Sequence, residues 1–134
     1  MNIEIIEKKL KQLVKKAIKK DEVPIAALIV HNNRIISEAF NLVNKKNNFM
    51  YHAEIIAINK AMKKLKNWRL NNCDLYVTLE PCLMCKEIIK KSRIKKVFYF
   101  CKQNNEKTES DISLSYIENN LFSDELKKFF KEKR

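Results

Sequence analysis

The chain of 134 residues contains no glycine. P-loops and the G-x-G-x-x-G loops that bind dinucleotides both depend on glycine, so neither can be present. Turns that need a positive φ must use other residues, and asparagine tolerates that conformation. The segment His31-Asn32-Asn33-Arg34 is therefore predicted to be a tight turn that joins two strands.

The spacing of apolar residues predicts both helices and strands. Helices are predicted at residues 3–18, 52–66, 81–92 and from Ser123 to about Lys133. Strands are predicted at residues 25–30, 35–40, 75–79, 96–101 and, as a short fifth strand, 112–117. The first strand is apolar throughout, which is typical of a strand covered on both faces. Residues 41–51 are predicted to be a polar loop.

This order of elements predicts one α/β domain over residues 1–134, a three-layer α/β/α sandwich around a mixed sheet of four to five strands. A crossover to a parallel strand usually takes about a dozen residues or more. Residues 102–111 are barely long enough for one. The fifth strand is therefore expected to be antiparallel, or too short to count.

The amino-acid composition limits which binding partners and which cellular compartment the protein can have. Twenty-eight basic against 16 acidic side chains leave a net charge of +12, which favours a polyanionic partner such as nucleic acid. A genome-wide bias in amino-acid composition explains the charge equally well. Most of the basic residues are lysine rather than arginine, whose guanidinium group donates paired hydrogen bonds to phosphate. No segment is apolar enough to span a membrane, and residues 1–10 do not resemble a secretory signal. We expect a cytoplasmic protein with no membrane partner.

Two short motifs carry chemistry, His52-x-Glu54 and Pro81-Cys82-x-x-Cys85, and each opens a predicted helix. Two cysteines three residues apart share one helix face, and the amino end of a helix favours the thiolate that ligates metals. With one imidazole nitrogen from His52, the motifs predict one Zn²⁺ per chain.

The fourth zinc ligand decides between a structural and a catalytic site, because catalytic zinc leaves that position to water. Cys73 or Cys101 could complete a structural site, although both lie in apolar runs typical of buried cysteines. The other histidine, His31, lies in the predicted turn. An open site is favoured, and Glu54 is predicted to be a proton shuttle rather than a ligand, because positions i and i+2 of a helix point in different directions.

The motif pair H-x-E…P-C-x-x-C is the signature of zinc-dependent nucleobase deaminases. The sequence resembles the bacterial tRNA-specific adenosine deaminases of the cytidine deaminase-like superfamily over nearly its whole length. The segments that carry the resemblance are Glu22-Val23-Pro24-Ile25, His31-Asn32-Asn33-Arg34, Phe40-Asn41, His52-Ala53-Glu54-Ile55, Leu75 to Cys82, Met84-Cys85 and Ser92-Arg93-Ile94.

The resemblance implies hydrolytic deamination of adenosine to inosine at the wobble position of a tRNA anticodon loop by a zinc-activated water. It places zinc on His52, Cys82 and Cys85, with Glu54 as the catalytic proton shuttle. It further implies a cytoplasmic homodimer that binds the tRNA anticodon stem-loop. The implied substrate-binding residues are Asn41, Phe129 and Phe130.

Two other functions stay open. A deaminase of free cytosine, guanine or a nucleotide would share every catalytic residue. A non-catalytic, zinc-stabilised RNA-binding subunit would have no use for Glu54. Met50-Tyr51 and Lys86-Glu87 replace small residues that are usual in the family, which indicates a changed pocket wall.

Overall fold

The computed structural model describes residues 1–103, 112–119, 122 and 124–128. Its helices are α1 (Ile3–Lys19), α2 (Val43–Lys46), α3 (Ala53–Leu65) and α4 (Leu83–Lys91). Its strands are β1 (Ala26–His31), β2 (Arg34–Phe40), β3 (Cys73–Leu79), β4 (Lys96–Cys101) and β5 (Ser113–Tyr116). Among the described residues, no helix combines the length and apolar character needed to cross a membrane.

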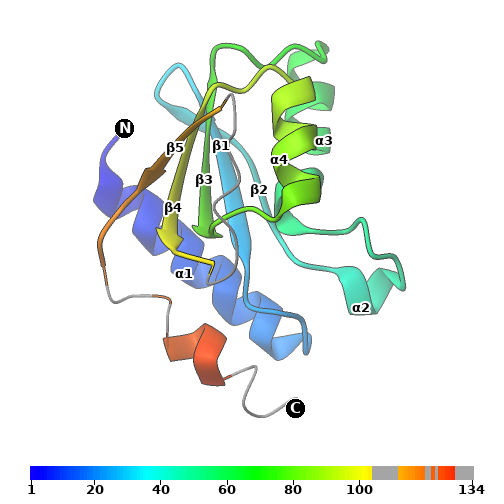
Figure 1. The fold of residues 1–134 in the computed structure, drawn as a ribbon, viewed down its shortest axis with the longest axis vertical. Coiled ribbons are helices and arrows are strands. Elements are labelled where there is room, and N and C mark those ends of the chain that lie inside the picture. The colour runs from blue at the N-terminus through cyan, green and yellow to red at the C-terminus, as the bar shows by residue number, and fades with distance from the viewer. Residues whose placement is uncertain (104–111, 120–121, 123, 129–134) are drawn as a thin grey trace.

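The strands form one mixed sheet in the order β2-β1-β3-β4-β5 (Figure 1). Strand β1 is antiparallel to both β2 and β3, whereas β3, β4 and β5 run parallel. Helix α1 covers one face of the sheet, and α3 and α4 cover the other (Figure 1). The predicted three-layer α/β/α sandwich is confirmed.

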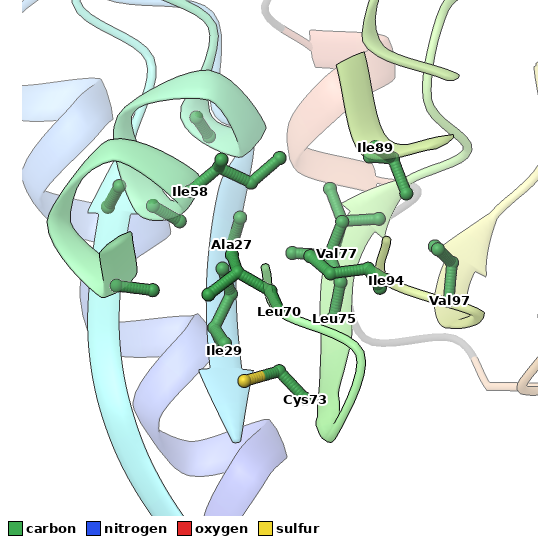
Figure 2. Packing of buried hydrophobic residues seen from close by; sticks show 14 of the residues in the cluster. Ala27, Ile29, Ile58, Leu70, Cys73, Leu75, Val77, Ile89, Ile94 and Val97 are labelled. Carbon is green, nitrogen blue, oxygen red and sulfur yellow. The ribbon is translucent and has the colours of Figure 1, made fainter. Parts of the chain in front are cut away.

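Strand β1 explains why the sheet needs cover on both faces. Ala26, Leu28 and Val30 belong to the core under α1, while Ala27 and Ile29 belong to the core under α3 and α4. All five side chains are buried, as the continuous apolar run predicts. Figure 2 shows the second core, where side chains of α3 and α4 meet those of β1 and β3.

The expectation for the fifth strand was wrong, because β5 pairs parallel with β4, from Lys96↔Ser113 to Tyr99↔Tyr116. Residues 102–112 connect the two strands. If extended, such a connection reaches about 36 Å, whereas β4 itself spans only about 20 Å at ~3.3 Å per residue. The chain can therefore return to the start of β4 without a crossover helix of ordinary length.

Several boundaries differ from the prediction by one or two residues, and β3 begins at Cys73 rather than at residue 75. The polar loop 41–51 contains the short helix α2. Pro81 does not lie in the first turn of α4 but precedes its N-cap. The last predicted helix is present at residues 124–128, while Ser123 and residues 129–133 lie outside the described part of the chain.

Residues with positive φ occupy turn positions where many proteins place glycine. They are Asp21, Asn32, Asn33, Asn47, Lys66 and Arg93. The pair Asn32-Asn33 confirms the predicted tight turn between β1 and β2. Lys66 ends α3 in the left-handed region, with φ 53° and ψ 39°.

Replacing Lys66 by glycine should therefore stabilise the protein by about 1 kcal/mol, because glycine relieves the steric cost of the left-handed conformation. The matched control is Lys64→Gly, inside α3, which should destabilise by roughly 0.5–1 kcal/mol. Chemical denaturation of both variants measures the difference. Equal destabilisation by the two substitutions would contradict this account of the helix end.

Candidate metal centre and active site

His52 and Cys82 are the N-cap residues of α3 and α4. N-cap side chains usually accept a hydrogen bond from the first turn of their own helix. Neither of these side chains does so. Both helices begin at the end of the sheet where β3 terminates (Figure 1). The two side chains are therefore available for each other and for a shared ligand.

Three donor atoms come together at this point. One donor atom each of His52, Cys82 and Cys85 lies within 4.8 Å of the others. The Nδ1 atom of His52 is 3.8 Å from the Sγ of Cys82 and 3.5 Å from the Sγ of Cys85. Tetrahedral zinc with ordinary bond lengths separates a nitrogen ligand from a sulfur ligand by about 3.6 Å. The donor types and their spacing fit zinc.

The two thiols differ in their electrostatic environment. Hydrogen bonds with Cys85 and His52 lower the pKa of Cys82 to about 4, because they stabilise its thiolate. The pKa of the Cys85 thiol is raised, since it hydrogen-bonds to the Cys82 sulfur and is itself buried. The hydrogen bond with Cys82 also raises the pKa of His52. The cluster thus favours a thiolate at Cys82 and a protonated thiol at Cys85, whose proton a cation can displace.

Glu54 lies beside these donors without belonging to the group of three. Its side chain is 4% exposed, and burial raises its pKa to about 7. It hydrogen-bonds to the thiol of Cys85. The carboxyl group therefore reaches from the first turn of α3 across to α4, next to the ligands.

The other cysteines of the chain lie elsewhere. Cys73 starts β3 at the opposite end of the sheet, with its Sγ 3.7 Å from Nδ1 of His31, and Figure 2 shows it among apolar side chains. Cys101 ends β4 in the core under α1. Neither belongs to the group of donors within 4.8 Å. The structure therefore does not provide the Cys₃His site that the sequence left open.

Asn41 follows β2 and lies against the first turn of α3. Its Oδ1 atom accepts a hydrogen bond from the backbone N–H of Ala53 at 3.1 Å, and the residue is 5% exposed. Asn41 thus provides the cap that the side chain of His52 does not. Phe129 and Phe130 lie outside the described residues, so their predicted contacts with substrate stay predictions.

Sequence analysis missed Glu22 as a structural support of the site. Its carboxylate is fully buried and accepts hydrogen bonds from the backbone N–H groups of Asn44 and Lys45, at 3.0 and 2.7 Å. Charge-assisted bonds of this kind fix α2 and with it the loop that leads to His52. The sequence offered two signals, an acidic residue at the start of an apolar segment and its place in a segment that resembles the tRNA-specific adenosine deaminases.

Lys86 also has a role that sequence analysis did not assign. It follows Cys85 directly, is 7% exposed, and its Nζ lies 3.3 Å from Oε2 of Glu80. The other carboxylate oxygen of Glu80 accepts a hydrogen bond from the backbone N–H of Gln103. This ion pair ties the first turn of α4 to the chain that leaves β4.

Exposed apolar side chains adjoin the ligands in the sequence. Phe49, Met50 and Tyr51 precede His52, and Leu83 follows Cys82. All four are exposed to solvent. The bulky pair Met50-Tyr51 therefore adds apolar surface next to the donor cluster.

Residues 2–101 match the protein family described as the cytidine and deoxycytidylate deaminase zinc-binding region. The chain belongs to this deaminase family. The matched range includes all three donor residues and Glu54. The predicted cofactor of this deaminase-family protein, zinc, is therefore supported by both the family and the geometry of the site.

Relatives of this deaminase-family chain include tRNA-specific adenosine deaminases. One from Rickettsia bellii is 51% identical over 85 residues, which cover 62% of this chain and 59% of the relative. Another, from Buchnera aphidicola, is 40% identical over 127 residues, which cover 84% of this chain and 83% of the relative. The chain thus spans less than two thirds of the first of these relatives and most of the second.

Solved structures show the same deaminase fold. A structure from a study of A-to-I editing by tRNA:A34 deaminases at the wobble position has a TM-score of 0.75 and 29% identity, and the match covers 86% of this chain and 99% of that one. A guanine deaminase from Bacillus subtilis has a TM-score of 0.70 and 38% identity, covering 76% and 66% of the two chains.

The purified protein should contain one zinc per chain, and Cys82→Ala or Cys85→Ala should remove it, because two donors with one thiolate bind zinc far more weakly. Cys73→Ala is the matched control and should keep its zinc. Elemental analysis of the three variants measures the metal directly. Full occupancy in either ligand variant would overturn the ligand assignment.

Proposed function

We propose that the protein hydrolyses adenosine to inosine at the wobble position of a tRNA anticodon loop. The observation that carries this proposal is the 40% identity to a tRNA-specific adenosine deaminase over most of both chains. The buried carboxyl group of Glu54 beside the donor cluster supports a catalytic rather than a structural site. The proposal treats residues 1–134 as one deaminase domain, supported by two cores that share a single sheet.

The proposed zinc ligands are Nδ1 of His52 and the sulfur atoms of Cys82 and Cys85. Zinc in such a site supplies Lewis acidity that makes water a better nucleophile at neutral pH. Two thiolates and one neutral imidazole balance its charge. The helix termini under Cys82 and His52 fix the directions from which the donors approach.

Glu54 is the proposed catalytic residue. Water adds to C6 of the purine, and Glu54 accepts one of its protons and donates it to N1. A second proton reaches the amino group through the same carboxylate, so the C6–N bond breaks and ammonia leaves. The net change consumes adenosine and water and yields inosine and ammonia. Burial shields the carboxyl group from bulk solvent during these transfers.

The substrate contacts belong to the same proposal. Asn41 adjoins the donor cluster through the first turn of α3, and we propose that it hydrogen-bonds a flipped nucleotide. The exposed apolar side chains Phe49 to Tyr51 offer surface on which bases can pack. The net charge of +12 suits the phosphates of an anticodon stem-loop. Phe129 and Phe130 are proposed to stack on that loop.

The proposed assembly is a cytoplasmic homodimer. A hollow of about 400 Å³ lies beside α3, with Ile55 and Ile56 among its apolar lining residues and Asn48, Asn59, Lys60 and Lys63 as its polar ones. Its apolar part is proposed to be buried against a second copy of the chain.

Deamination of free guanine is the second candidate. It is favoured by the 38% identity to the Bacillus subtilis guanine deaminase. Both reactions replace an exocyclic amine of a purine by oxygen, so the catalytic residues do not separate them.

Replacing Glu54 by glutamine should retain zinc and lower turnover by at least about 10²-fold, because the amide keeps the shape of the side chain but cannot shuttle protons. The matched control is Glu4→Gln, an exposed glutamate of α1 on the other face of the sheet, which should retain full turnover. Zinc content and the rate of ammonia release are measured for both. Loss of zinc from Glu54→Gln would make Glu54 a ligand, and unchanged turnover would remove Glu54 from the mechanism. Absence of turnover in the unmodified, zinc-loaded protein would support the non-catalytic RNA-binding subunit instead.

An RNA hairpin with adenosine at the wobble position should be converted to inosine, while free adenosine, cytidine and guanine should not. The loop supplies phosphate and stacking contacts that a free base lacks. Mass spectrometry of the digested RNA measures inosine, and chromatography follows the free bases. Efficient release of ammonia from guanine with an inert hairpin would replace the proposed substrate by the second candidate.

A further inference from the structure

Three of the four arginines of the chain lie at the end of the sheet opposite the zinc ligands. Arg34 opens β2, Arg69 lies between α3 and β3, and Arg93 lies between α4 and β4. The strand register places these segments together, because His31 pairs with both Arg34 and Cys73. Figure 1 shows these connections at the top of the molecule, whereas α3 and α4 begin at the bottom.

Trp68 lies between two of these arginines. The guanidinium carbon of Arg69 is 4.4 Å from the centre of the Trp68 ring, and that of Arg93 is 5.7 Å away. A 2.8 Å hydrogen bond from the N–H of Leu70 to the carbonyl of Ser92 joins the two loops. Trp68 nevertheless remains 47% exposed. Within the described residues, neither guanidinium forms an ion pair with a carboxylate.

Two hollows flank His31 at this end. One, of about 470 Å³, has Arg34, Lys64 and Asn32 among its lining residues. The other, of about 240 Å³, is lined by Arg69 and by several asparagines, Asn67, Asn71 and Asn72. Among the described residues, no acidic side chain lines either hollow. Cations and amides without competing carboxylates suit phosphate and ribose oxygens.

We propose that Arg34, Trp68, Arg69 and Arg93, here called the arginine surface, bind the substrate RNA at a second place, outside the anticodon loop. The inference rests on the proposed function, because it assumes an RNA substrate. The seven residues of β3 separate this surface from the zinc ligands by about 23 Å at ~3.3 Å per residue. The guanidinium group of arginine can donate two parallel hydrogen bonds to one phosphate, whereas lysine binds it as a point charge. The exposed indole of Trp68 is a surface on which a base can stack.

Trp68 is the only tryptophan in the chain, so the emission of the unmodified protein reports on this surface. Titration with full-length tRNA should change the fluorescence emission of Trp68 until it saturates. The midpoint of this change should equal that of tRNA binding measured by the fluorescence anisotropy of labelled RNA. A minimal RNA hairpin of the anticodon loop, which is too short to reach the second place, should leave the emission unchanged while it occupies the active site. Binding of tRNA by anisotropy with no change in emission would overturn the inference.

Substitution of the three arginines tests whether their charges contact phosphates of the RNA. In the triple variant Arg34→Gln, Arg69→Gln and Arg93→Gln, the slope of log affinity against log salt should fall by up to about 2.7, at ~0.9 for each lost phosphate contact. The control removes the same charge from the exposed face of α1 by Lys8→Gln, Lys11→Gln and Lys15→Gln. Zinc content and melting temperature verify that both variants fold. An equal change of slope in the two variants would overturn the inference, because only net charge would then matter.

The two proposals can fail separately. If tRNA changes the emission of Trp68 but the hairpin adenosine is not converted, the arginine surface stands and the proposed function fails. If the hairpin is converted and Trp68 does not respond to tRNA, the proposed function stands and the arginine surface fails.

Discussion

The site depends on the meeting of two helix N-termini at one end of the sheet. His52 begins α3 and Cys82 begins α4, thirty residues apart in sequence, yet their donor atoms lie 3.8 Å apart. Neither side chain caps its own helix, so each helix gives up a local hydrogen bond worth about 1 kcal/mol. Asn41 restores one of these bonds by accepting from the first turn of α3. Metal binding and helix capping are thus divided between different residues.

The sheet determines where those termini meet. Cys82 lies three residues beyond Leu79, the last residue of β3, and Asn41 directly follows β2. Buried Glu22 fixes the loop between Asn41 and His52 through two backbone N–H groups, and the pair Lys86–Glu80 fixes the start of α4. One buried carboxylate, Glu22, and one half-buried carboxylate, Glu80, therefore support the site from outside the group that would bind metal. The arginines collect at the other end of the same strands.

Local features could be predicted from the sequence, and contacts between distant segments could not. The apolar run at residues 25–30 revealed burial on both faces, and Asn32-Asn33 revealed a turn, because each pattern follows from neighbouring residues alone. The parallel orientation of β5 depends on the path of its connection, which composition does not encode. Glu22 lies in a segment that carries the family resemblance, but its structural role could not be predicted, since only the fold brings the N–H groups of α2 to it. The grouping of Arg34, Arg69 and Arg93 likewise arises only when three loops meet.

The central claim is an open zinc site with two sulfur ligands and one imidazole. X-ray absorption at the zinc edge of the purified protein tests it most directly, because it counts sulfur neighbours separately from nitrogen and oxygen. The account predicts two sulfur atoms at about 2.3 Å and two nitrogen or oxygen atoms at about 2.0 Å. Three or four sulfur neighbours would indicate a closed structural site and contradict the account.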